Sequence, residues 1–170
     1  MKIRRPRLQD GFTLVELLIV VVILGVLAAI AIPQFSASTD DSKAAALDAT
    51  LSNLRTAIEL YYQQHGSYPS AVAAGGSFGA VDTEAAFVAQ LVKYTSATGA
   101  ASNTKDATYK YGPYLKKSTV PTDPIKNVAT VEVVTAGSLG MTATSGDPGG
   151  WKFDNKTGQL IVNIAAYQSR

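Results

Sequence analysis

The chain has 170 residues, of which 46% are hydrophobic and 16% are charged, and its formal net charge is +2. This length suggests one globular domain, and the composition argues against intrinsic disorder, which requires low hydrophobicity and high charge. The chain contains no cysteine, which excludes disulfides, thiol catalysis and cysteine-ligated metal sites.

The basic charge is concentrated in the first eleven residues. They contain four basic residues and one acidic residue, so the rest of the chain has eleven basic and twelve acidic residues. Basic residues beside an apolar run mark the cytoplasmic side of a membrane. Nucleic-acid binding is the alternative interpretation, but the remaining chain has no basic stripe, and we expect no nucleic-acid partner.

An uninterrupted apolar run follows this basic segment. No polar residue occurs from Leu17 to Ile32, and Pro33 ends the run. With residues 12–15 included, the run approaches the ~20 residues that span a bilayer as a helix. An ordinary signal peptide is the alternative, but its apolar region has roughly 7–15 residues, and here Glu16 lies just inside the start. We therefore predict a membrane-spanning helix over residues 12–33.

A second helical pattern lies between residues 36 and 64. Its apolar residues recur at spacings of four, three, four and three, which is typical of one face of an amphipathic helix. The signals that end this helix are His65, Gly66 and Pro69, whereas Pro33 either kinks the chain or separates the two helical segments. The apolar face consists of Leu47, Leu51, Leu54, Ile58 and Tyr61.

The remaining chain changes from a helical to a β pattern. Residues 71–80 read as a loop, residues 83–94 as a short helix capped by Asp82 or Thr83, and residues 95–108 as an exposed polar stretch. Residues 128–135 favour a strand, and residues 151–154 and 159–164 favour a hairpin with Gly158 in its turn. The expected fold class is α+β: a long N-terminal helix with a small antiparallel sheet packed on its second half.

Residues 11–33 resemble the type IV prepilin signature, which type IV pilins share with the pseudopilins of type II secretion. The residues that carry the resemblance are Gly11, Phe12, Glu16, Gly25 and Pro33, in and around the apolar run. Residues 60–69, 112–117, 120–124, 150–154 and 157–158 are similar to the major pseudopilins. Residues 71–108 match no pattern of the family.

The resemblance implies a processing and assembly pathway. A prepilin peptidase would cut between Gly11 and Phe12, remove residues 1–11 and methylate the new Phe12 amine. Glu16 would pair with the Phe12 amine of a neighbouring subunit; the alternative is a carboxylate that snorkels to the membrane interface. Gly25 and Pro33 would bracket a segment that unwinds on assembly, or be ordinary residues of a membrane helix.

A metal site is a weak expectation. Major pseudopilins commonly hold calcium in a late loop, but residues 137–150 offer one carboxylate, Asp147. Calcium prefers six to eight oxygen ligands, usually with several carboxylates. We therefore expect no cofactor, with Asp147 as the only calcium candidate. Many type IV pilins close a late loop with a disulfide, which this chain cannot form.

Together these observations predict a structural filament subunit and no enzyme, because no nucleophile–base or metal constellation occurs in the sequence. We expect a leader (1–11), a filament-core helix (12–33) and a periplasmic or extracellular head (34–170), anchored in the bacterial inner membrane. The expected partners are further copies of the chain, the prepilin peptidase, other secretion or pilus components and lipid. The first candidate is the major pseudopilin of type II secretion, and the alternative is a type IV pilin for adhesion, motility or DNA uptake.

Overall fold

The computed structural model describes residues 11–170, without the side chains of residues 31–33 and 35–37. Most of the predicted leader therefore lies outside the described residues. The chain divides into two compact units at Ser42, and the second unit, Lys43–Arg170, is called the head unit below. Helix α1 (Leu14–His65) contributes to both units.

The backbone of α1 is helical at both predicted weak points, Gly25 and Pro33. Pro33 therefore does not separate two helices. Among the described residues, no helix combines the length and the apolar character needed to cross a membrane. The membrane span predicted over residues 12–33 is not confirmed, and it includes three residues whose side chains are not described.

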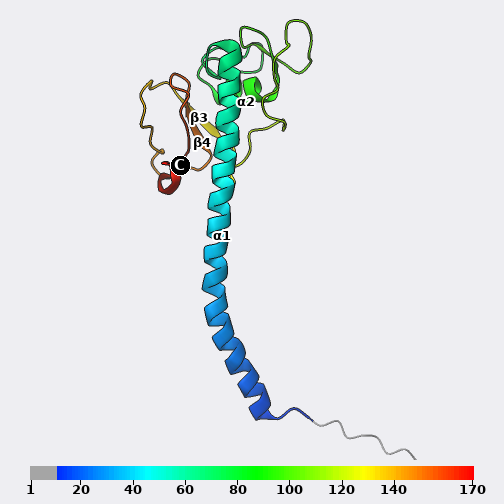
Figure 1. Ribbon diagram of the computed structural model, residues 1–170, viewed down its shortest axis with the longest axis vertical. Coiled ribbons are helices and arrows are strands. Elements are labelled where there is room, and N and C mark those ends of the chain that lie inside the picture. Colours follow the sequence, from blue (N-terminus) through cyan, green and yellow to red (C-terminus); the bar gives the residue numbers. More distant parts are fainter. Residues whose placement is uncertain (1–10) are drawn as a thin grey trace, which may run out of the picture. The chain divides into compact units, whose positions relative to one another are not determined.

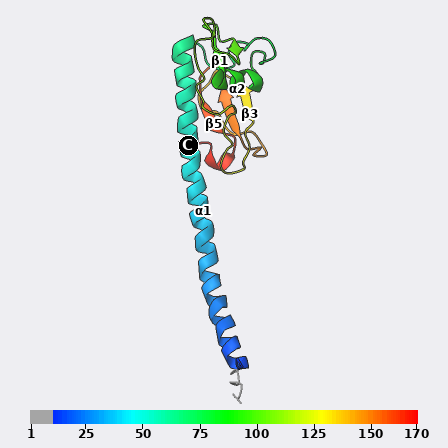
Figure 2. The same ribbon diagram turned by 90° about the vertical axis from the view of Figure 1, so that its right-hand side faces the viewer.

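The head unit packs a small sheet and a short helix beside the second half of α1 (Figures 1 and 2). The short helix has the predicted cap, because the Thr83 hydroxyl accepts a hydrogen bond from the Ala86 amide at 3.2 Å. The elements after α1 are α2 (Glu84–Val92), β1 (Tyr94–Thr95), β2 (Ala101–Ser102), β3 (Val131–Val134), β4 (Trp151–Asp154), β5 (Leu160–Val162) and a 3₁₀ turn, η1 (Ala165–Tyr167).

The main sheet has the order β3-β4-β5 and is mixed. The predicted hairpin is confirmed: β4 and β5 are antiparallel, with Trp151 opposite Val162, and Gly158 adopts a φ of +75° in the turn. The predicted small antiparallel sheet is present in β4 and β5, and β3 is added to it by a parallel pairing with β4 that the sequence did not predict. The long connection over residues 135–150 returns the chain to the starting end of β3, which a parallel pair requires.

The predicted apolar face of α1 forms the core of the head unit. All five of its residues, from Leu47 to Tyr61, are at most 2% exposed. They belong to one cluster with Trp151, Phe153 and Leu160 of the hairpin, and the ring of Phe87 from α2 lies 4.8 Å from that of Phe153. The helix and the sheet each bury the apolar side of the other.

The stretch expected to be exposed, residues 95–108, is partly buried. Thr95, Ser96 and Ala101 are at most 6% exposed, so the prediction is wrong for these residues. Ala101 belongs to a second apolar cluster with Ala74 and with Ala86 and Ala89 of α2. The buried Gln90 amide connects this region: it accepts from the Ser70 amide at 2.6 Å and donates to the Gly99 carbonyl at 2.9 Å.

A buried aspartate organises the turn over residues 121–128. Asp123 is fully buried, and its carboxylate accepts four backbone hydrogen bonds of 2.6–3.0 Å. These bonds compensate the loss of hydration, because a buried carboxylate without partners is strongly unfavourable. One bond reaches across to the start of β4 and thereby attaches the turn to the sheet. The donors are the amides of Ile125, Lys126, Val128 and Gly150.

The chain's single histidine closes the end of α1. His65 Nε2 lies 2.9 Å from the Tyr114 hydroxyl and 3.0 Å from Thr95 Oγ1. Its ring is 4.1 Å from that of Tyr61. Burial lowers the pKa of His65, and the Ala97 carbonyl opposes this shift only in part. The histidine therefore connects α1 to the segments that follow α2, rather than being a solvent-exposed helix end.

Replacing Asp123 tests the role of its carboxylate. In Asp123→Ala the four backbone donors lose their acceptor inside the protein, so we expect the free energy of unfolding to fall by about 3–5 kcal/mol. Urea unfolding of residues 43–170 measures this change. Asp106→Ala is the matched control, because the exposed Asp106 also accepts two backbone hydrogen bonds. This substitution should lower the free energy of unfolding by less than about 1 kcal/mol. Equal losses in the two variants would contradict the role of Asp123.

The lowered pKa of His65 predicts a pH-dependent stability. The unfolded chain binds the histidine proton more readily than the folded chain, so stability is present above the unfolded pKa of about 6.5 and falls as the pH drops below it. Denaturant midpoints between pH 7 and pH 5 measure this effect, and His65→Gln should flatten the profile. Since the chain has one histidine, a wild-type profile that is flat in this window would refute the prediction.

Candidate functional site: the start of helix α1

The first turn of α1 is closed by a reciprocal pair of side chains. Glu16 Oε2 accepts hydrogen bonds from the Thr13 amide at 2.8 Å and from the Thr13 hydroxyl at 2.7 Å. In return, Thr13 Oγ1 accepts from the Glu16 amide at 3.2 Å. This arrangement is a capping box, in which the residue before the helix and the third helical residue satisfy each other's amides. Glu16 therefore fixes where α1 begins.

Sequence reasoning missed the contribution of Thr13. The signal was present, because Thr13 and Glu16 have the spacing of a capping box directly before an apolar run. A carboxylate at this end also interacts favourably with the positive end of the helix dipole. The structure thus gives Glu16 a role within one subunit, beside the role between subunits that the sequence predicts.

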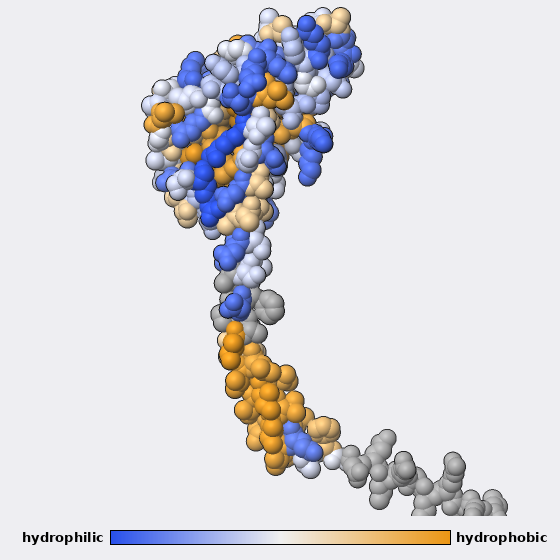
Figure 3. Space-filling model, viewed as in Figure 1, coloured by the Kyte–Doolittle hydropathy of each residue, from blue (hydrophilic) through white to orange (hydrophobic). Residues whose placement is uncertain are grey.

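The helix after Glu16 presents apolar side chains in every direction. The large apolar residues from Leu17 to Ile30 are each exposed by 47–70%. Figure 3 shows the resulting continuous hydrophobic surface along this part of α1. Soluble proteins rarely expose an apolar surface of this extent, and such surfaces mark contacts with protein or membrane. The capped first turn and this surface form the candidate functional site.

The predicted site residues Gly11, Phe12 and Gly25 also lie in this part of the chain and are exposed to solvent. Phe12 is 79% exposed, and a side chain placed at Gly11 or Gly25 would meet no atom within 4 Å. The Gly11–Phe12 bond is therefore sterically open. Neither glycine packs against other described residues, and the roles predicted for them in cleavage and assembly stay predictions.

The calcium candidate Asp147 has hydrogen-bond partners within the protein. Its Oδ1 accepts a hydrogen bond from the Ala165 amide at 2.8 Å, and the Lys126 ammonium binds its backbone carbonyl. Within residues 11–170, no group of three or more histidine or acidic side chains is placed to hold a metal. Asp147 is the only carboxylate among residues 137–150, whereas calcium sites usually contain several.

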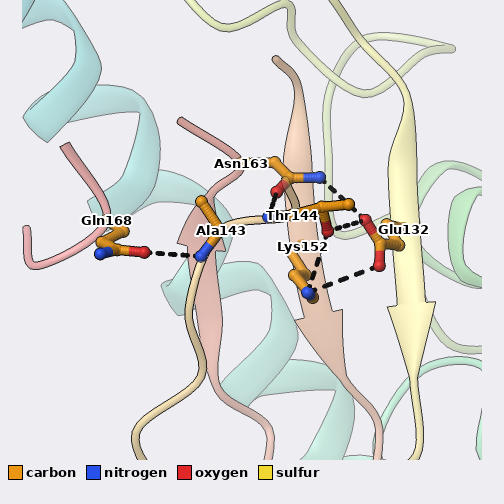
Figure 4. A network of polar contacts seen from close by, with 6 residues as sticks. All are labelled: Glu132, Ala143, Thr144, Lys152, Asn163 and Gln168. Atoms are coloured by element: carbon orange, nitrogen blue, oxygen red, sulfur yellow. Dashed lines mark hydrogen bonds and ion pairs between the residues drawn. The ribbon is translucent and has the colours of Figure 1, made fainter. Parts of the chain in front are cut away.

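A network of side chains holds the same loop (Figure 4). Glu132 accepts from Thr144 Oγ1 at 2.5 Å and from Asn163 Nδ2 at 2.9 Å, and Lys152 lies 3.5 Å from its other oxygen. Burial acts to raise the pKa of Glu132, but these hydrogen bonds and the Lys152 charge outweigh it, so the pKa is lowered. Protein groups therefore satisfy the carboxylate that faces this loop.

Comparisons with known proteins agree with the features at the start of α1. The family model described as the prokaryotic N-terminal methylation motif matches residues 6–32. Type II secretion system core protein G of Pseudomonas aeruginosa is 39% identical over 64 residues, which cover 38% of this chain and 45% of that protein. Core protein G of Aeromonas hydrophila is 27% identical over 158 residues, 88% of this chain and 96% of that protein.

Fimbrial proteins and type IV pilins match this chain with a similar percentage of identical residues. A fimbrial protein of Neisseria meningitidis is 35% identical over 99 residues, which cover 56% of this chain and 58% of that protein. The matched region thus spans about half the length of the Pseudomonas and Neisseria relatives. No solved structure matches the chain. The chain carries the prokaryotic N-terminal methylation motif and is homologous to type II secretion core protein G and to type IV pilins.

Proposed function

We propose that this chain is a non-enzymatic structural subunit of a type IV pilus-like filament. The observation that carries the proposal is the exposed apolar surface from Leu17 to Ile30, which follows the capped first turn of α1. Burial of apolar surface is the main favourable term in association, so this surface requires lipid or other apolar helices around it. In a filament, further copies of the same helix supply that environment.

The processing pathway completes the proposal. The prepilin peptidase removes residues 1–11 at the open Gly11–Phe12 bond and methylates the Phe12 amine. Before assembly the apolar part of α1 anchors the subunit in the inner membrane, with the head unit on the periplasmic side. After assembly the same surface packs against neighbouring α1 helices. The homologous relatives and the methylation motif support this sequence of events.

Glu16 gives the assembled helices a defined axial position. Apolar surfaces alone attract but allow sliding, whereas a buried charge is unfavourable by several kcal/mol unless it meets its partner. The Glu16 carboxylate uses one oxygen for its own helix start. We propose that its charge also pairs with the Phe12 amine of an adjacent subunit.

The type II secretion pseudopilus is the favoured filament. The alignment with core protein G of Aeromonas hydrophila spans 88% of this chain, whereas the Neisseria fimbrial protein aligns with 56%. A type IV pilus is the second candidate, since that shorter alignment has the higher identity. Deleting the gene separates the two: loss of enzyme export supports a pseudopilus, and loss of surface pili with normal export supports a pilus.

The composition of isolated filaments tests the proposed function. Filaments visible by electron microscopy should contain this chain, and mass spectrometry should give residues 12–170 plus one methyl group. The reason is that the leader, the open cut site and the apolar helix follow in the order that the peptidase needs. A chain that keeps Met1, or one cut beyond Ala31, would contradict the proposal.

Variants of the capping box separate the two roles of Glu16. Glu16→Gln keeps an acceptor for Thr13 but removes the charge, so we expect normal cleavage and no filaments. Thr13→Ala keeps the charge and weakens the helix start by about 1 kcal/mol, so we expect filaments in reduced amount. Electron microscopy and immunoblots of the membrane fraction measure both outcomes.

Glu16→Leu is the matched reference, because it removes both the charge and the acceptor, and it should resemble Glu16→Gln. Filaments of normal yield from Glu16→Gln would show that the charge has no pairing role. Loss of filaments in Thr13→Ala to the same degree as in Glu16→Gln would assign the effect to the helix start instead.

A further inference from the structure

The head unit has a groove with a mixed polar and apolar floor and a basic rim. The groove encloses about 560 Å³ between the exposed side of α1 and the segment over residues 114–121. Its floor includes Leu60, which is 44% exposed. Lys116 and Lys117 are exposed at the rim and form no ion pair among the residues that the structure describes.

The wall that carries the two lysines is held at both ends. The Leu115 amide donates to the Leu91 carbonyl of α2 at 2.9 Å, and Trp151 Nε1 donates to the Pro121 carbonyl at 2.8 Å. Both anchors belong to the core of the head unit. The groove is therefore a fixed feature of the fold, and the lysines project from an anchored backbone.

The same chain has a complementary acidic segment on α1. Asp40 and Asp41 are exposed, and no ion pair involves them in the described part of the chain. The next acidic residue of the helix, Asp48, is already paired with Arg170 at 2.6 Å. Ser42 and the exposed Lys43 follow the two aspartates, and the three small residues after them, Ala44 to Ala46, allow another backbone to approach closely.

We infer that the Lys116–Lys117 groove of one subunit binds the Asp40–Asp41 segment of a second copy of this chain. The inference rests on the proposed function, because a filament brings identical chains together through unlike surfaces. In this contact two adjacent lysines would face two adjacent aspartates, whose charge Lys43 of the same segment offsets only in part. Repeated along the filament, this contact selects the correct neighbour, since opposite charges favour it and like charges disfavour other pairings.

Reversing the charges tests the contact in the full chain. K116D/K117D and D40K/D41K should each lower the yield of filaments by about tenfold or more, because attraction becomes repulsion at every interface. The quadruple variant restores opposite charges and should recover most of the yield. Filaments of wild-type yield from either double variant, or no recovery in the quadruple variant, would overturn the inference.

Two controls separate this contact from general effects of charge and from failure of the proposed function. K105D/K110D changes the net charge equally in a loop that does not line the groove, and its yield should stay unchanged; an equal loss would overturn the inference. Wild-type cells lacking filaments would refute the proposed function instead.

Cross-linking gives a second readout that does not depend on charge reversal. The chain has no cysteine, so every disulfide that this chain forms involves a cysteine introduced at Asp41 or Lys117. Oxidised filaments should then give a ladder of covalently linked chains. The pair at Asp41 and Lys105 should give none. An absent first ladder, a ladder from the control pair, or a disulfide from Lys117→Cys to a different protein would overturn the inference.

Discussion

The head unit depends on the burial of one face of α1. The residues from Leu47 to Tyr61 are covered by the hairpin β4–β5 and by α2, and without them the sheet would have no second layer. A small sheet of short strands needs a second layer to cover its apolar side. A helix whose apolar face is exposed to water is likewise unstable by itself. Each element therefore stabilises the other, and the polar anchors around Asp123 and His65 act on a core already formed.

The first part of α1 differs from the second part, because its apolar side chains are not buried within the subunit. From Leu17 to Ile30 its apolar side chains remain exposed within the subunit, so this stretch gains nothing from intramolecular packing. One helix thus combines a segment that folds the head with a segment that remains available for association. The change between them coincides with the boundary of the two compact units near Ser42.

Polar groups position the loops that the core does not reach. Asp123, Gln90 and Glu132 each accept or donate several hydrogen bonds within loops that have few large apolar residues. Each such hydrogen bond adds only a little to the free energy of unfolding, but a buried polar group without a partner lowers it considerably. Satisfied polar side chains therefore hold these loops in place.

The sequence alone determined the local and periodic features. These are the apolar run, the amphipathic stripe, a cap at Asp82 or Thr83 and the hairpin with Gly158, because each depends on neighbouring residues or a fixed spacing. Tertiary structure decided the parallel pairing of β3 with β4, the burial of Thr95 and Ala101, and the role of Asp123. These features depend on which distant segments meet, and the spacing of residues along a chain carries no information about that.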